Sequence, residues 1–277
     1  MIMKHKSIIA LFVLGAFIAT ASSGYQLFDM TDYSTGFFKM QFQKSGWMVT
    51  LFIGVVIACI GLVAAQSRRN PRRSKETTPI FIAVSAVYAV FGIYEVFAND
   101  FARLLSPAVS TVVLILGVLS SLSVVGISLP VGEYRGVLAF VPLCYSLLRL
   151  VLPFSRYTKM PSTAQNVYEL AFLCLQLLFW LYAAMMFNSV SKKRAVAHLL
   201  PLSLMMAAVC SVIAVPQFVA FFAVPEAVHS GTVEPLFLIG AGVYSAYFSL
   251  ELYNIKRIYP KGFTENKAGK DYYIGDN

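Results

Sequence analysis

Eight long apolar runs, separated by polar segments, constrain the fold of this 277-residue chain more than any other feature. A helix needs about 20 apolar residues to cross the hydrocarbon core of a bilayer, and each run approaches that length. Lipid offers no hydrogen-bond partners to peptide groups, so each run is expected to form a continuous helix. We therefore predict an all-α, polytopic transmembrane helix bundle over residues 1–253, with spans at 7–23, 47–65, 80–98, 106–127, 136–154, 166–188, 198–223 and 234–253.

Composition supports a membrane protein and argues against a nucleic-acid partner. Hydrophobic residues make up 58% of the chain, charged residues only 13%, and the mean hydropathy is +0.71. These values lie outside the usual range of soluble domains. The net charge of +9 is not gathered on one face of a soluble module, as in a nucleic-acid binder. Because the basic residues lie between apolar runs, we expect contacts with the lipid bilayer and its anionic headgroups.

Lysine and arginine concentrate in every second gap between the runs, and this predicts the orientation. Basic residues collect on the cytoplasmic side of a membrane. Sixteen of the 22 lie on one side: Lys4, Lys6, Arg68, Arg69, Arg72, Arg73, Lys75, Arg135, Lys192, Lys193, Arg194, Lys256, Arg257, Lys261, Lys267 and Lys270. Both termini are therefore predicted to be cytoplasmic, in the cell (cytoplasmic) membrane. Residues 254–277 are short and polar with three glycines, which predicts a flexible cytoplasmic tail.

The first run allows two interpretations. Two lysines precede it and small residues follow at 19–22, as in a secretory signal peptide. Cleavage after Ala21 would leave seven spans without changing the rest of the topology. Alternatively, Gly15, Ala19 and Ser23 form a ladder of small residues suited to packing a retained helix. We favour the retained helix and hence eight spans.

The four cysteines, Cys59, Cys144, Cys174 and Cys210, all fall inside apolar runs. They show no C-x-x-C or Cys/His spacing typical of zinc sites. We therefore expect them to be small hydrophobic residues of a packed interior, and we predict no metal and no cofactor.

Three ionisable residues inside the apolar runs are the strongest candidates for a functional site, because a charge within the bilayer is costly. With the predicted orientation, Glu95, Arg149 and Glu169 lie near the outer ends of the third, fifth and sixth spans, at one level. The fifth and sixth spans are joined by a short loop and should run antiparallel side by side. Glu169 is therefore the favoured partner of Arg149.

Four further residues extend this site by helical spacing. Tyr88 shares a face with Glu95, Tyr145 lies one turn before Arg149, Gln176 lies two turns after Glu169, and Gln217 follows Pro216 in the seventh span. The predicted ligand-binding residues are thus Glu95, Arg149, Glu169, Tyr88, Tyr145, Gln176 and Gln217. The alternative is that the polar groups hydrogen-bond between helices and that the three charged residues only clasp the helix ends.

Catalytic motifs are missing from the sequence. Neither H-E-x-x-H nor G-x-x-x-x-G-K-[ST] occurs, and no histidine lies well inside a span to serve as a base. We therefore predict no catalytic residues. The sequence leaves both an enzyme and a non-enzyme open, and the lack of a catalytic motif favours a non-enzyme.

The stretch from Phe140 to Phe187 contains Arg149, Arg156-Tyr157, Tyr168-Glu169 and Leu178-Phe179-Trp180. In these residues it resembles uncharacterised multipass membrane proteins of bacteria. The resemblance implies a bacterial cytoplasmic membrane and supplies no activity.

Two functional hypotheses follow from the sequence. The first is a small-solute permease or binding-coupled membrane protein, whose polar site faces outward and takes a small polar solute. The alternative is a non-transporting membrane sensor or assembly partner, in which the aromatic segment between the first two spans receives a ligand or protein. The sequence gives no indication of an oligomer.

Overall fold

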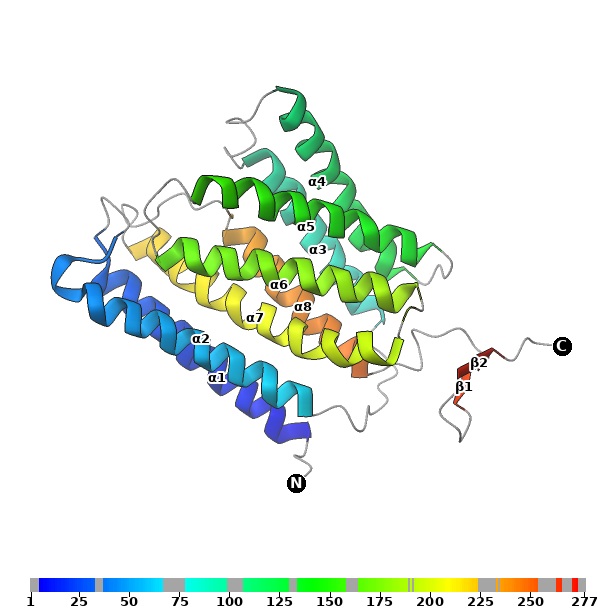
Figure 1. Cartoon of the computed structure of the whole chain (residues 1–277), viewed down its shortest axis with the longest axis horizontal. Helices are drawn as coiled ribbons and strands as arrows, with labels where there is room; N and C mark the ends of the chain where they lie inside the picture. Colours follow the sequence, from blue (N-terminus) through cyan, green and yellow to red (C-terminus); the bar gives the residue numbers. More distant parts are fainter. Residues whose placement is uncertain are drawn as a thin grey trace.

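The computed structural model describes residues 5–32, 37–66, 78–98, 107–129, 134–157, 164–188, 190, 192–223, 233, 235–253, 263–265 and 271–273. Within these ranges the chain folds into eight α-helices (Figure 1). They are α1 (His5–Tyr25), α2 (Gln43–Gln66), α3 (Thr78–Ala98), α4 (Pro107–Ser128), α5 (Arg135–Tyr157), α6 (Ala164–Phe187), α7 (Lys192–Ala223) and α8 (Pro235–Tyr253).

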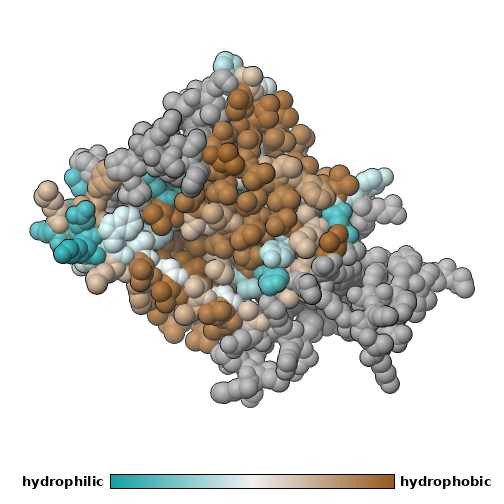
Figure 2. Space-filling view, viewed as in Figure 1, coloured by the Kyte–Doolittle hydropathy of each residue, from teal (hydrophilic) through white to brown (hydrophobic). Residues whose placement is uncertain are grey.

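The predicted all-α membrane bundle is confirmed. Seven of the described helices, α1 to α7, are long and apolar enough to cross a membrane, and α8 is apolar but shorter, over Pro235–Leu250. Figure 2 shows apolar residues covering the sides of the helices. Large apolar side chains of the described helices, such as Phe17, Leu51 and Val90, are more than half exposed. An apolar surface of this extent is expected to contact lipid.

Six helices close into a ring that surrounds the candidate site. From α3 to α8 each helix packs against the next, and α8 packs back against α3. Figure 1 shows α5, α6 and α7 lying in front of α3 and α8, with α4 at the top of the view. The space between these two layers is filled with large rings, among them Phe172, Phe179, Trp180 and Tyr244, each at most 1% exposed.

The hairpin of α1 and α2 packs on the outside of this ring, against α7. Gly15 lies against Ile60 of α2, Ala19 is fully buried, and the Ser23 hydroxyl donates to the Val212 carbonyl of α7 at 2.8 Å. The three small residues of the predicted ladder thus all lie in packed or hydrogen-bonded positions. Because these side chains are small, α1 can approach α2 and α7 closely.

Gln26 connects this hairpin to the ring. It begins a π-helical segment, η1 (Gln26–Met30), that follows α1. Its amide donates to the Gly46 carbonyl at 2.9 Å and to Thr50 Oγ1 at 2.7 Å, both on α2. Its Oε1 accepts a 2.7 Å bond from the Tyr168 hydroxyl of α6. One buried amide therefore links η1 to α2 and to α6 through three hydrogen bonds.

The region between α1 and α2 also contains a bridge between Thr31 and Phe38 and a 3-10 turn, η2 (Met40–Phe42). In the predicted tail, β1 (Phe263–Glu265) pairs antiparallel with β2 (Asp271–Tyr273). The rest of the tail, at 254–262, 266–270 and 274–277, lies outside the described residues.

The expected interior placement of the cysteines is wrong for three of them. Cys59, Cys144 and Cys174 are exposed, and only Cys210 is buried. A thiol is weakly polar and tolerates an apolar surface, so an apolar run does not distinguish the inner from the outer face of a helix.

Candidate functional site

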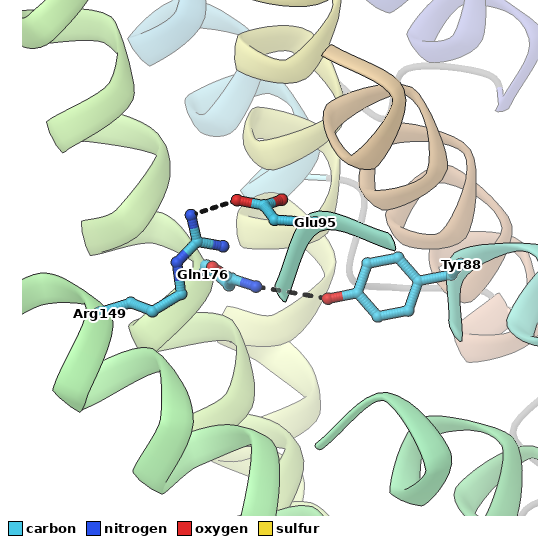
Figure 3. Close-up of polar contacts among 4 residues, drawn as sticks. All are labelled: Tyr88, Glu95, Arg149 and Gln176. Carbon is cyan, nitrogen blue, oxygen red and sulfur yellow. Dashed lines mark hydrogen bonds and ion pairs between the residues drawn. The ribbon is translucent and has the colours of Figure 1, made fainter. Parts of the chain in front are cut away.

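A buried ion pair forms the centre of the site. Arg149 Nη2 of α5 lies 2.6 Å from Glu95 Oε1 of α3, as Figure 3 shows. Glu95 is 1% exposed and Arg149 8% exposed. The distance is that of a short, charge-assisted hydrogen bond. Two residues that the sequence placed at one level therefore meet in space.

The structure gives Arg149 a different partner from the one that chain order favoured. Glu169 is fully buried and accepts a hydrogen bond of 3.1 Å from Gln165 one turn earlier on α6. The fifth and sixth spans, α5 and α6, do pack side by side, as expected. Which faces they turn toward each other, however, depends on the whole ring and is not given by the length of a loop.

Gly117 of α4 explains how α3 and α5 come together. A Cβ at this position would overlap the Val96 side chain of α3 and would lie 3.1 Å from the Tyr145 ring of α5. Because glycine has no side chain, both helices approach the same point of α4. Val96 and Tyr145 are close in sequence to Glu95 and Arg149, so this contact aligns the charged pair.

Aromatic rings surround the guanidinium. The Arg149 Cζ atom lies 5.4 Å from the centre of the Phe237 ring and 5.8 Å from that of Tyr145. Both distances are within the range of cation–π attraction. Phe237 in turn packs against Tyr88, with ring centres 5.4 Å apart, and edge-on against Phe172 at 6.2 Å. The charge is thus enclosed by apolar surfaces.

A second polar group lies next to the ion pair. Gln176 Nε2 of α6 donates to the Tyr88 hydroxyl of α3 at 3.3 Å (Figure 3). The Tyr88 ring stacks on Tyr244 of α8 at 5.1 Å, and Tyr244 stacks on Trp180 at 6.0 Å. The site therefore continues from the charged pair into a column of stacked rings.

Three buried polar atoms of this column have no hydrogen-bond partner among the described residues: Gln176 Oε1, Trp180 Nε1 and Tyr244 Oη. Leaving such an atom without a partner costs about 1–3 kcal/mol, so most buried polar atoms are bonded. Trp180 stacks on Tyr244, and Gln176 joins them through Tyr88, so the three atoms lie in one connected group of side chains with unmet hydrogen-bonding capacity.

The structure brings together five of the seven predicted site residues. All seven are buried, with exposed fractions of 8% or less. Tyr88, Glu95, Tyr145, Arg149 and Gln176 join through the contacts given above. Glu169 lies two turns from Gln176, and Gln217 makes no hydrogen bond to this group within the described part of the chain.

Sequence reasoning missed the contribution of α8. Phe237 and Tyr244 are seven residues apart and therefore lie on one face of this helix, with Phe248 one turn further. That spacing was visible in the sequence. In an apolar helix, however, aromatic residues at helical spacing look the same whether they line a site or contact lipid.

Among the described residues, the site brings together the Arg149 guanidinium, the Glu95 carboxylate and the Gln176 amide inside an apolar enclosure. No group of three His, Cys, Asp or Glu side chains that could hold a metal ion occurs among the residues described. No protein-family model, curated protein or solved structure matches this chain. The chemistry that the geometry supports is recognition of charge in a water-poor environment.

Proposed function

We propose that this protein is a small-solute permease of the cytoplasmic membrane, and that Glu95 and Arg149 bind the solute. The observation that carries the proposal is the buried Glu95–Arg149 pair inside a ring of apolar helices. Ionisable residues that face the interior of a membrane bundle commonly mark substrate or ion pathways.

Stability alone gives little reason for such a pair. Removing two charges from water costs several kcal/mol per ion, and a well-packed apolar replacement of a buried pair is often neutral or stabilising. If packing alone stabilised the bundle, leucine or methionine at positions 95 and 149 would give similar stability. We therefore attribute the pair to function.

Solute binding in this proposal requires the two side chains to part, because they contact each other directly at 2.6 Å. Each charge must then find a replacement partner of the correct sign, since an uncompensated charge in an apolar interior is strongly disfavoured. The pair thereby selects for solutes that carry charge.

The basic segments complete the proposal. With both termini in the cytoplasm, the ends of α3 and α5 that carry Glu95 and Arg149 face outward. The lysines and arginines of the inner segments then contact anionic headgroups and hold the bundle in this orientation. The solute would enter from the outer side, where Phe237 begins the aromatic enclosure.

The test is osmotic swelling of proteoliposomes, followed by light scattering, with a panel of amino acids, monocarboxylates, amines and polyols. We expect protein-dependent entry of at least one charged class, and loss of that entry in Arg149→Met and Glu95→Gln. Arg135→Met is the matched control, because Arg135 lies at the opposite end of α5 and bonds to the Leu129 carbonyl. Vesicles impermeable to every solute would contradict the proposal, and a stoichiometric protein partner would then favour the sensor or assembly role.

A further inference from the structure

We propose that the solute of the Glu95–Arg149 site is a zwitterion, an α-amino acid with an apolar or aromatic side chain. This inference rests on the proposed function, because it names the solute class of the same site.

The charges of the site match those of an amino acid. One carboxylate and one guanidinium face each other within 2.6 Å, both in the protein interior. When a zwitterion enters, its carboxylate pairs with Arg149 and its ammonium pairs with Glu95. The enclosure then holds two neutral ion pairs in place of one, so no net charge is buried. A monoanion or a monocation would replace only one side of the Glu95–Arg149 pair.

Gln176 supplies a further acceptor for the ammonium group. An ammonium group has three donors, and Glu95 does not use them all. Gln176 Oε1 is buried and has no hydrogen-bond partner among the described residues, while its Nε2 is held by Tyr88. Figure 3 shows Arg149 and Gln176 reaching toward Glu95 and Tyr88 from neighbouring helices. A simple carboxylate solute has no hydrogen-bond donor that could bond to Gln176 Oε1.

The rings around Arg149 determine the rest of the solute. Phe237 and Tyr145 lie over the guanidinium, and Phe237 contacts Phe172 and Tyr88. A solute whose carboxylate reaches Arg149 must place its remaining atoms against these rings. Apolar side chains gain from such contact, and aromatic ones also gain from edge-to-face packing. Solutes with polar bodies, such as sugars, would lose hydrogen bonds to water there.

The experiment is direct binding of radiolabelled phenylalanine and leucine to the purified full-length protein in detergent. Competitors remove one charge at a time while keeping the apolar body: 3-phenylpropionate and 4-methylpentanoate lack the ammonium, and 2-phenylethylamine and 3-methylbutylamine lack the carboxylate. We expect every one of these analogues to compete at least ~30-fold more weakly than its parent amino acid, the usual loss when one partner of a buried charge pair is removed.

Variants give a readout that does not depend on loss of binding alone. Glu95→Gln removes the carboxylate that pairs with the ammonium group of the solute. We therefore expect this variant to bind 3-phenylpropionate more tightly than phenylalanine, a reversal of the wild-type order. Phe237→Leu is expected to weaken phenylalanine binding by about tenfold, since a ring contact is worth ~1 kcal/mol beyond the area that it buries. Its control is Phe221→Leu, because Phe221 is 60% exposed on the outer surface of α7.

Three results would overturn the inference. Equal competition by the carboxylates would indicate a monoanion site, and equal competition by the amines would indicate a monocation site. Absence of binding by either amino acid, with Arg149-dependent entry of another solute in the swelling assay, would refute the zwitterion and leave the permease standing. If no solute enters the vesicles at all, the proposed function itself fails.

Discussion

Arg149 of α5 and Glu95 of α3 form a 2.6 Å ion pair across 54 residues of sequence, although α3 and α5 are separated in chain order by α4. Gly117 of α4 makes this contact sterically possible, because a side chain at position 117 would occupy the space that Val96 and Tyr145 fill. The geometry of the ion pair therefore depends on a small residue at position 117 of the intervening helix.

The first prediction concerns the stability of this pair. Glu95→Gln and Arg149→Met each remove one member of this buried ion pair and are expected to destabilise the protein by about 3–5 kcal/mol. The double variant is expected to cost less than the sum of the two. Unfolding by denaturant in detergent micelles, analysed as a double-mutant cycle, measures the coupling. Strictly additive effects would show that the two side chains do not interact.

The second prediction concerns Gly117. Gly117→Ala adds a methyl group that overlaps Val96, and overpacking of this kind costs about 1–3 kcal/mol. The matched control is Gly54→Ala on α2, where a Cβ meets nothing within 4 Å. Removing a helix-interior glycine there is expected to be neutral or to stabilise by up to ~1 kcal/mol. Equal melting-temperature shifts in the two variants would argue against the close approach at Gly117.

The third prediction concerns the connection between the α1–α2 hairpin and the ring. Tyr168→Phe removes the donor to Gln26 Oε1 and leaves that buried oxygen without this partner, at a cost of about 1–3 kcal/mol. Hydrogen exchange should rise in η1 and in the first turns of α2. Tyr25→Phe, at a half-exposed position on α1, should leave exchange unchanged. The same exchange pattern in both variants would contradict the role given to the Gln26 network.

The fourth prediction concerns the cysteines. Cys59, Cys144 and Cys174 are exposed on the outer surface of the helices and Cys210 is buried. In detergent micelles a small apolar maleimide that partitions into the detergent should therefore modify the first three faster than Cys210, as read by mass spectrometry of peptides. Labelling of Cys210 at a similar rate, under conditions where the protein stays folded, would contradict the buried position of this residue on α7.

Much of this fold could be predicted from the sequence, because lipid restricts the chain so strongly. Runs of about 20 apolar residues leave helix as the only structure that satisfies the backbone. Each of the eight predicted spans corresponds to a helix whose bounds lie within four residues of the predicted ones, except that α7 begins six residues earlier, at Lys192. The shared level of Glu95 and Arg149 followed from the same alternation of spans.

The rest depended on which face each helix turns inward, and an apolar run does not reveal that. Leucine and phenylalanine are equally suited to the interior and to lipid, so the buried ring of Phe237 and the exposed thiol of Cys144 had no distinguishing signal. The choice of Glu95 over Glu169 as the ion-pair partner likewise depended on the closure of six helices into a ring. Loop length alone does not determine that closure.

The most direct measurement is a crystal structure of the protein with phenylalanine bound. We expect the solute carboxylate on Arg149 and its ammonium between Glu95 and Gln176 Oε1, with the 2.6 Å contact between the two side chains broken and the ring against Phe237. An intact Glu95–Arg149 contact, with the amino acid bound elsewhere or not at all, would contradict the claim that this ion pair is the solute site.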